Sequence, residues 1–452
     1  MRDSETAGTG LRRQGLCAAF LVATLLATPA HADEALTAAV KADYDGHLGA
    51  LFTHFHQTPE LSFLETATAK RMAAELKAAG VTVTSSVGGT GVVGVIKNGN
   101  GPTVLLRADM DGLPVEEKTG LAYASKATQK GLDGVTYPVM HACGHDTHIT
   151  AMVGTARQLS KLKDRWQGTV LFVVQPAEER VGGARAMVED GLYTRFGKPD
   201  YALAFHVAAE LATGKISASE GIQYSSADSI DITVPGVGTH GAAPHLGKDP
   251  VYIASQIVVA LQSIDSRELG PLDPGVVTVG SFHAGSKHNI ISDRADLQLT
   301  VRANNQETRD KIVAAVERIA VGVGRAHGLP DDKLPIVKVT ESTPVTVNNA
   351  ALARRLNASL ARDLGEGVVV PFEQKNMGAE DFAFFVEPRF GIPGYYFAVG
   401  GTPQAAFDAA KAGGPPVAGH HSPLFQVDGE AAVTLGTRAM VMATLELLQP
   451  PT

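Results

Sequence analysis

The hydrophobic pattern divides the chain into alternating stretches of strand and helix character. Short runs rich in Val, Leu, Ile and Phe predict buried strands at residues 103–107, 169–175 and 201–205. Apolar residues at helical spacing lie beside them and predict helices at 67–79 and 147–162. Strands that alternate with helices in this way predict an α/β fold built on a mostly parallel sheet.

The pattern changes near residue 221. Strands are predicted at 229–234, 276–282, 295–302 and 336–340, and helices at 250–264 and 307–327. The resulting order βαββαβ predicts a ferredoxin-like unit. Because helix and strand then alternate again up to a helix at 431–448, we expect a discontinuous first domain, residues 33–221 and 342–452, with an inserted domain at 222–341. The Gly-, Pro- and Ala-rich segment 400–419 predicts a long loop.

The N-terminal residues have the features of a secretory signal. Arg12 and Arg13 precede an apolar run at 16–27, and small residues surround a cleavage position after Ala32. This run is shorter than the roughly 20 residues that span a bilayer, which favours a removed signal peptide, residues 1–32, over a retained anchor. We therefore expect an exported protein, periplasmic or secreted, that begins at Asp33. The arginine pair leaves both the Sec and the twin-arginine routes open.

Composition and charge narrow the class of protein. A chain of 452 residues with 44% hydrophobic residues is long enough for two or three globular domains. A formal net charge of −8 excludes the strong positive field that nucleic-acid binding or attachment to anionic lipid needs. Removal of the signal would leave Cys143 as the one cysteine, so no intramolecular disulfide is expected.

Polar residues with metal-ligand chemistry follow four expected strands. They are Asp109 and Asp111 after the first strand, Cys143 and His145 after an expected strand at 137–140, Glu178 and Glu179 after 169–175, and His206 after 201–205. The carboxyl ends of parallel strands lie at one edge of a sheet, so these side chains can converge although they are distant in sequence.

These residue types predict a metal site. In an extended segment Cys143 and His145, two residues apart, project to one side. Thiolate, imidazole and carboxylate groups together bind divalent ions such as zinc. A buried apolar cysteine beside ordinary core histidines is the alternative for any one of these residues alone. Their convergence favours the metal site.

The adjacent pair Glu178 and Glu179 suggests a division of roles. Neighbouring side chains diverge in extended backbone, so one carboxylate can bind metal while the other takes a proton from water. An ordinary surface pair of acidic residues is the alternative explanation.

Several short motifs occur in a fixed order along the chain. They are Pro59-Glu-Leu-Ser-Phe63, Arg107-Ala-Asp-Met-Asp111-Gly-Leu-Pro114, His141-Ala-Cys-Gly-His-Asp146, Gln175-Pro-Ala-Glu-Glu179, His240-Gly-Ala-Ala-Pro-His245 and Met377-Gly-Ala-Glu-Asp381. With them the chain resembles the M20 metallopeptidase superfamily, in particular its branch of aminoacylases, hippurate hydrolases and auxin-conjugate hydrolases. The resemblance implies two divalent ions per subunit, Mn²⁺ or Zn²⁺ with Co²⁺ or Ni²⁺ also possible, and an inserted lid domain that forms a homodimer.

The resemblance also implies roles for single residues. Cys143 is similar to a bridging metal ligand, and the further ligands it implies are His145, Glu179, His206 and His421. His421 is preferred to His420 because it directly precedes Ser422-Pro423. Glu178 is similar to the general base of the family. Asp109 and Asp111 resemble residues that support the ligands from a neighbouring strand end.

For the inserted domain, the resemblance implies contacts with the substrate. His240 is similar to a lid histidine that enters the partner's active site and stabilises the oxyanion. Asn289 and Arg302 resemble the groups that hold the substrate carboxylate, for which a planar guanidinium is suited. Ser292 stands where the family usually has proline. Segments 128–137 and 400–419 are longer than usual and adjoin the motifs, so we expect a reshaped acyl pocket.

The sequence thus predicts a metal-dependent amidohydrolase that cleaves N-acyl amino acids or similar small-molecule conjugates. An exported dipeptidase or carboxypeptidase of the same superfamily is the nearest alternative. A non-catalytic binding protein on the same scaffold is a third, which the presence of Glu178 and of every candidate ligand disfavours.

Overall fold

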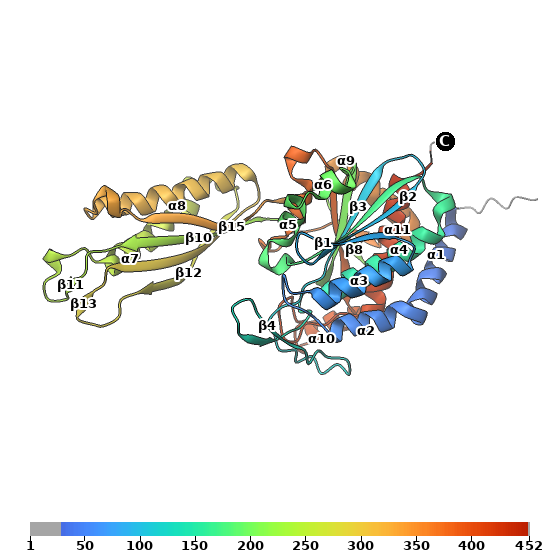
Figure 1. Ribbon diagram of the computed structural model, residues 1–452, viewed down its shortest axis with the longest axis horizontal. Helices are drawn as coiled ribbons and strands as arrows, with labels where there is room; N and C mark the ends of the chain where they lie inside the picture. Colours follow the sequence, from blue (N-terminus) through green and yellow to red (C-terminus); the bar gives the residue numbers. More distant parts are fainter. Residues whose placement is uncertain (1–28, 451–452) are drawn as a thin grey trace, which may run out of the picture.

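A computed structural model describes residues 29–450 and consists of two units side by side (Figure 1). The first helix, α1 (Pro29–Asp43), begins just before the cleavage position predicted after Ala32. The preceding part of the predicted signal peptide lies outside the described residues. Within residues 29–450, none of the helices is both long and apolar enough to cross a membrane.

The larger unit, here called the sheet unit, is built on eight strands. Their order across the sheet is β1 (Thr82–Val87), β2 (Gly91–Asn98), β6 (Gly168–Gln175), β3 (Thr103–Asp109), β7 (Tyr201–Ala212), β18 (Gly394–Thr402), β8 (Ile216–Ser217) and β17 (Val369–Val370). The four central strands β6, β3, β7 and β18 are parallel, whereas β1 and β2 form an antiparallel edge. The predicted mostly parallel α/β sheet is therefore confirmed.

Helices cover both faces of this sheet. One face packs against α1, α2 (Gly49–Gln57), α3 (Thr66–Ala78), α4 (His145–Lys161), α9 (Ala350–Leu364) and α11 (Gly429–Leu447). The other face packs against α5 (Gly183–Glu189), α6 (Leu192–Phe196) and the 3₁₀ turn Asp381–Val386. Along β3, Leu106 points into the first core and Leu105 into the second. Burial of both faces explains why the central strands are continuous apolar runs.

The smaller unit, here called the lid unit, has its own sheet and core. Its elements in chain order are β10 (Ser226–Pro235), α7 (Pro250–Leu261), β12 (Gly275–Ala284), β14 (Arg294–Ala303), α8 (Gln306–Ala326) and β15 (Ile336–Thr343). The strands are antiparallel in the order β12-β14-β10-β15, and both helices pack on one hydrophobic core. This is the predicted βαββαβ arrangement of a ferredoxin-like fold.

The lid unit is joined to the sheet unit by the antiparallel pair β9 (Gly221–Tyr224) and β16 (Thr346–Asn348). Within the lid unit, on its side of this junction, Arg309 on α8 makes a two-pronged ion pair with the buried Asp228 on β10, at 2.6 and 2.8 Å. Asn304 of the lid unit donates to Gln374 of the sheet unit at 2.8 Å. Polar contacts therefore connect the two units where the chain passes between them.

Three local expectations are wrong. The expected strand at 137–140 is not part of the large sheet, because β5 (Thr136–Pro138) pairs with β4 (Thr128–Lys130) as a separate hairpin. His206 lies inside β7 rather than beyond its end, since that strand continues to Ala212. The expected loop at 400–419 contains the end of β18 and the helix α10 (Gln404–Lys411). The four alanines in α10 favour the helix.

Candidate metal centre

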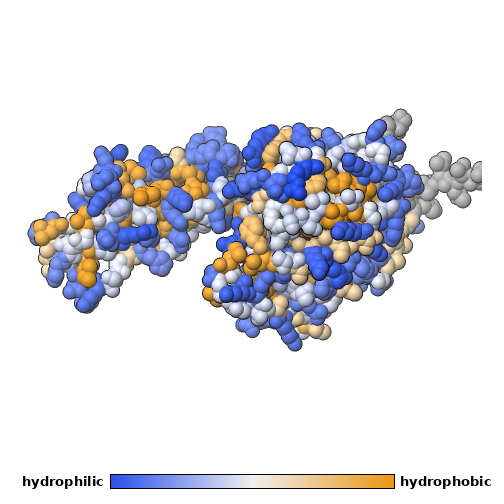
Figure 2. Space-filling view, in the orientation of Figure 1, coloured by the Kyte–Doolittle hydropathy of each residue, from blue (hydrophilic) through white to orange (hydrophobic). Residues whose placement is uncertain are grey.

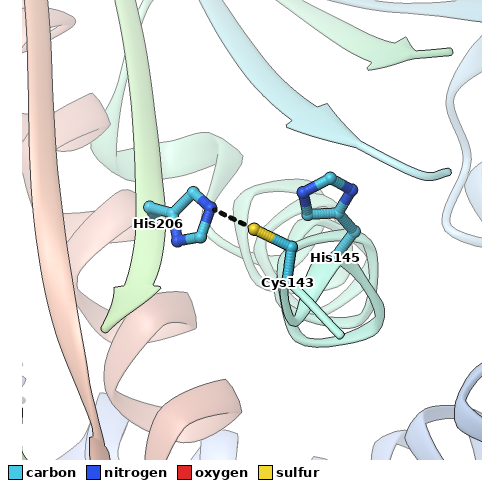
Figure 3. Close-up of side chains that lie close together, drawn as sticks. All are labelled: Cys143, His145 and His206. Atoms are coloured by element: carbon cyan, nitrogen blue, oxygen red, sulfur yellow. Dashed lines mark hydrogen bonds between the residues drawn. The ribbon is translucent and has the colours of Figure 1, made fainter. Parts of the chain in front are cut away.

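Cys143, His145 and His206 lie together at the carboxyl edge of the sheet, with the Cys143 sulfur between the two rings (Figure 3). His206 Nε2 is 3.4 Å from Cys143 Sγ. His206 Nδ1 donates to the Val207 carbonyl at 2.7 Å, and His145 Nδ1 donates to the Asp111 carbonyl at 2.8 Å. These hydrogen bonds keep a proton on each Nδ1, so Nε2 is the nitrogen of each ring that can bind a metal.

A tight turn, and not the expected extended segment, brings Cys143 and His145 to one side. Gly144 between them has φ +84°, in the left-handed region, and His145 is the first residue of α4. A Cβ at position 144 would lie 2.4 Å from Val207 Cγ1 on β7. The turn therefore needs glycine both for its backbone conformation and for close packing against the strand that carries His206.

Glu178 and Glu179 also lie in a turn. Ala177 has φ +48°, and residues Glu178–Arg180 form one turn of 3₁₀ helix, so the expected extended backbone is wrong. The N–H groups of Glu178 and Glu179 donate to the two Asp111 carboxylate oxygens at 3.0 and 3.1 Å. Asp111, buried and also bound by the Ser62 hydroxyl at 2.6 Å, thus holds the glutamate turn in place. It acts as a positioning residue.

Two consecutive histidines approach Cys143 from the C-terminal part of the chain. His421, with φ +64°, places Nε2 3.4 Å from Glu179 Oε2 and forms a candidate ligand group with Cys143 and Glu179. His420 Nδ1 is 3.8 Å from Cys143 Sγ, and its Nε2 accepts the Ala209 N–H at 3.3 Å. Because Nε2 accepts this bond, Nδ1 is the nitrogen left to donate toward the thiol. This arrangement suits His421 as the ligand and His420 as a hydrogen-bond donor to the sulfur.

Beneath the cluster lies a buried ion-pair network centred on Arg107. Its guanidinium is 2.7 Å from Asp109, 2.6 Å from Glu380 and 3.1 Å from Asp381. The Tyr396 hydroxyl donates to Glu380 at 2.5 Å. Arg107 thus fixes the strand end that carries Asp109 and Asp111 to the segment containing Glu380 and Asp381, far along the chain.

His148 links this network to β7. Its Nδ1 lies 2.5 Å from Asp109, and its Nε2 accepts the Val207 N–H at 2.9 Å. Sequence reasoning missed His148 and assigned no role to Arg107, Glu380 or Asp381. The available signals were the placement of His148 three residues after His145 on a helix, hence on the same face, and the two acidic motifs themselves.

The site contains more carboxylates than cationic side chains. Six carboxylates lie at or below the cluster, and the buried Arg107 guanidinium pairs with three of them, Asp109, Glu380 and Asp381. The others are Asp111, Glu178 and Glu179. Burial alone would lower the pKa of His145, but Asp109, Asp111 and Glu179 raise it to about 10. Burial and the carboxylates Glu179 and Glu178 raise the pKa of the Cys143 thiol. Burial and the neighbouring acids, Glu380 first, raise the pKa of Glu178 well above its ordinary value.

The donor atoms fit divalent ions. Among the described residues, His145 Nε2 and Glu179 Oε1 are buried without a hydrogen-bond partner, and they lie 3.9 Å apart. Cys143 belongs to two overlapping groups of candidate ligands, one with His145 and His206 and one with Glu179 and His421. Unpaired lone pairs that converge in an acidic, buried site are what metal coordination requires. The predicted ligands are therefore brought together, with Cys143 shared between the two groups.

The lid residues predicted from the resemblance do not lie at this cluster. His240 is in β11 (Thr239–His240), which pairs with β13 (Ile290–Ile291) directly after Asn289, and both strands lie at the end of the lid unit away from the sheet unit (Figure 1). Arg302 lies near the opposite end of β14, two residues before Asn304, which contacts Gln374. Asn289 and Arg302 are therefore separated along the lid sheet.

A Cys, His and Glu cluster at the edge of a parallel sheet, with a further buried glutamate beside it, defines a metal-dependent hydrolase. The chain belongs to peptidase family M20/M25/M40, whose model matches residues 105–412. Its relatives place it in the amidohydrolase branch of that family, which confirms the resemblance inferred from the motifs.

Similar proteins cover most of the chain. A hippurate hydrolase of Campylobacter jejuni is 39% identical over 77% of this chain and 87% of its own length. An IAA-amino acid hydrolase of Arabidopsis thaliana, ILR1-like 4, is 34% identical over 92% and 89%. Thermostable carboxypeptidase 2 of Saccharolobus solfataricus is 37% identical over 76% and 83%. The solved YXEP protein of Bacillus subtilis, a dinuclear metal-binding peptidase of the M20 family, is 29% identical, with a TM-score of 0.71 and coverage of 92% and 99%.

Metal removal should expose Cys143 to modification. With metal bound, the thiolate is occupied by coordination, and chelator-treated protein should react with iodoacetamide much faster. Mass spectrometry of peptides from metal-loaded and metal-free protein would measure the two rates. As a control for unfolding, circular dichroism should be the same in both states. Equal labelling rates would show that Cys143 is not a ligand.

Proposed function

We propose that this protein hydrolyses the amide bond of N-acyl amino acids or closely similar conjugates. The observation that carries the proposal is the buried Glu178 carboxylate, whose Oε2 is 3.8 Å from the ligand atom His145 Nε2. Its turn also presents Glu179 to the candidate metal ligands, so one carboxylate can bind metal while the other stays available for protons. Burial raises the pKa of this carboxyl group, so it holds a proton more readily than an exposed glutamate does, as a general base must after it accepts one.

The residues that would hold two divalent ions are Cys143, His145, Glu179, His206 and His421. Mn²⁺ or Zn²⁺, or else Co²⁺ or Ni²⁺, would supply Lewis acidity at the substrate carbonyl and make water easier to deprotonate. Glu178 takes the proton from the attacking water and later gives it to the leaving amine. Asp111 holds both glutamates in place because its carboxylate accepts hydrogen bonds from their backbone N–H groups. Arg107 and His148 hold Asp109 and β7 in fixed positions below the site.

We propose further that the active site is completed by a second copy of the chain. β14 spans Arg294–Ala303, a length of about 30 Å at the usual rise per residue, and it separates the Asn289 end of the lid unit from Arg302. Arg302 would bind the substrate carboxylate in its own subunit. The partner's His240 would donate to the oxyanion, and the partner's Asn289 would bind the carboxylate.

The surface of the lid unit supports such a homodimer. β12 is an edge strand of the lid sheet, without a neighbour on its outer side among the described residues. On α7 the apolar side chains of Val251, Tyr252 and Val259 are exposed, and apolar surface covers part of the lid unit in Figure 2. Exposed apolar side chains beside an open strand edge favour association with a like surface.

The Arg12-Arg13 pair and the apolar run after it support export of the protein.

The second candidate function is that of a carboxypeptidase or dipeptidase. It is favoured by the similarity to thermostable carboxypeptidase 2, and its chemistry would use the same ligands, base and carboxylate-binding groups. A matched panel separates the two functions: N-acetyl and N-benzoyl amino acids against dipeptides with the same C-terminal residues. We expect kcat/KM to be at least tenfold higher for the N-acyl series. Higher values for the dipeptides would overturn the proposed function.

Replacement of Glu178 tests the base. Glu178→Ala should bind the same amount of metal and fold normally, because neither of its carboxylate oxygens is needed by the Asp111 turn, which is held by backbone N–H groups. Its kcat should fall by at least roughly 10²-fold, as expected for loss of a general base. Metal content and circular dichroism are the controls. Turnover near that of the wild type at full metal content would place the base elsewhere.

Complementation tests the composite site. A mixed dimer of His240→Ala and Glu178→Ala chains, co-expressed with two tags and purified through both, has one site with both groups intact. We expect about half of the wild-type activity per dimer, whereas each parent dimer should be nearly inactive. A mixed dimer as inactive as its parents would contradict action of His240 across the dimer.

A further inference from the structure

The turn that carries Glu178 and Glu179, here called the glutamate turn, has an unfavourable backbone conformation. Ala177 has φ +48° and Val181 has φ +52°, both in the left-handed region that residues with a Cβ rarely adopt. Such residues remain in this region only where the surrounding structure holds them there. The conformation of Ala177 therefore depends on contacts from outside the turn.

Glu65, which lies directly before α3, provides such a contact. Its side chain is fully buried, and its Oε1 atom accepts the Ala177 N–H at 2.8 Å. The same oxygen accepts the N–H of Phe63 at 2.9 Å, and Phe63 is also left-handed, with φ +64°. The Thr90 hydroxyl lies 2.6 Å from the second oxygen, Oε2. One carboxyl group thus joins two left-handed residues from distant parts of the chain.

The segment before Glu65 also packs directly on the glutamate turn. A Cβ at position 182 would lie 2.9 Å from the Phe63 ring, so Gly182 allows the ring to approach the backbone. The Ser62 hydroxyl donates to Asp111 at 2.6 Å, and Asp111 accepts two further N–H groups of the turn. Three consecutive N–H groups of the turn therefore end on two buried carboxyl groups. The motif at 59–63, which had no assigned role, supplies both Ser62 and Phe63 to this contact.

Burial of the Glu65 carboxyl group is unfavourable by itself. Burial first, and then the nearby Asp111, raise its pKa to about 7, and the hydrogen bonds from Thr90 and Ala177 counter this rise. A proton on Glu65 fits at Oε2, because the Thr90 hydroxyl can donate to a carboxylate or accept from a carboxylic acid. Oε1 then remains an acceptor in either state. The hydrogen bond to Ala177 therefore does not depend on the charge of Glu65.

We propose that Glu65 is a positioning residue, which fixes the left-handed conformation of Ala177 and thereby the direction in which the turn presents Glu178. This inference rests on the proposed function, in which Glu178 is the base, and identifies a residue on which the placement of that base depends. A catalytic group that is misplaced by about 1 Å can lose roughly 10²-fold in rate. Loss of Glu65 should therefore lower kcat more than it raises KM.

Hydrogen exchange of the metal-loaded protein tests the contact without a measurement of activity. In Glu65→Ala, peptides that cover the glutamate turn should exchange at least roughly tenfold faster by mass spectrometry, because the Ala177 N–H has lost its acceptor. Glu65→Gln keeps a carbonyl oxygen at the same place and should exchange like the wild type. Glu75→Ala is the matched control, since Glu75 is also buried but pairs with His47 and Arg71 instead.

Kinetics on the N-acyl substrates test the consequence for catalysis. At full metal content, Glu65→Ala should lose at least roughly tenfold in kcat, with KM changed by less than about threefold. Glu65→Gln should stay within about threefold of the wild type in both constants. Glu75→Ala should keep the wild-type kcat, whatever its effect on the unfolding temperature.

A shorter acidic side chain covers the case in which Glu65→Ala does not fold. Glu65→Asp keeps the carboxyl group but is one methylene shorter, so it should lose the bond to Ala177 and show the same changes in exchange and in kcat.

Wild-type exchange of the glutamate turn in Glu65→Ala, or in Glu65→Asp where that variant takes its place, would overturn the inference. Equal losses in Glu65→Ala and Glu75→Ala would also overturn it, because general destabilisation would then explain the effect. Turnover retained in Glu178→Ala would overturn the proposed role of the base and this inference together. Unaltered exchange in Glu65→Ala, in a protein whose turnover does depend on Glu178, would refute the inference alone.

Discussion

The ion pairs of Arg107 are the interaction on which the site depends. One buried guanidinium joins Asp109, Glu380 and Asp381, and so ties the end of a central strand to a segment more than half the chain away. Removal of one partner from a buried pair commonly costs about 3–5 kcal/mol, because the remaining charge loses its compensation. Further carboxylates stand directly above, on Asp111, Glu178 and Glu179. The arginine alone does not balance them, so the fold creates a demand for cations at this edge of the sheet.

This excess of carboxylates explains why the side chains that position the site are separate from the side chains that are available to metal. Asp109 forms an ion pair with Arg107 and a hydrogen bond with His148. Burial would raise its pKa, but Arg107 first and then His145 hold it well below the ordinary value. Asp111 is occupied by backbone N–H groups and Ser62. Both aspartates are thereby committed to positioning. Glu179 keeps a carboxylate oxygen without a hydrogen-bond partner, and the raised pKa values of His145 and Cys143 mean that metal must displace a proton from each of them.

Much of the fold and of the site could be predicted from the sequence. Central strands buried on both faces are continuous apolar runs, so β3 and β6 were found by composition, and the change to alternating strands marked the lid unit. The candidate ligands Cys143, His145, Glu179 and His206 were recognised because they follow expected strands, whereas His421 was implied only by the resemblance to the family. Backbone conformation at the turns was not predictable in this way. The left-handed turns at Gly144 and Ala177 are stabilised by packing on Val207 and by the Asp111 carboxylate, which are tertiary contacts with no local pattern.

Contacts between residues that are distant in sequence were the other feature that the sequence did not predict. Arg107 and Glu380 are 273 residues apart, and the sequence around either residue does not indicate that the two will form an ion pair. The same holds for the hairpin, which was expected to be partly a strand of the main sheet. Its pairing with itself and its attachment through Gln129 turn it into a cavity wall beside Glu179. A single chain thus supplies the candidate metal ligands and two cavities beside them, while His240 and Asn289 lie at the far end of the lid unit.

We propose that the buried acidic groups are balanced by two divalent ions held by Cys143, His145, Glu179, His206 and His421. Calorimetric titration of the metal-free protein with Zn²⁺ or Mn²⁺ at about pH 7.5, in two buffers with different heats of ionisation, measures both the number of ions and the protons released. We expect about two ions per chain and a net release of protons, because His145 with a pKa of about 10 and the Cys143 thiol are protonated before binding. Absence of tight binding, or binding whose heat does not depend on the buffer, would contradict this proposal.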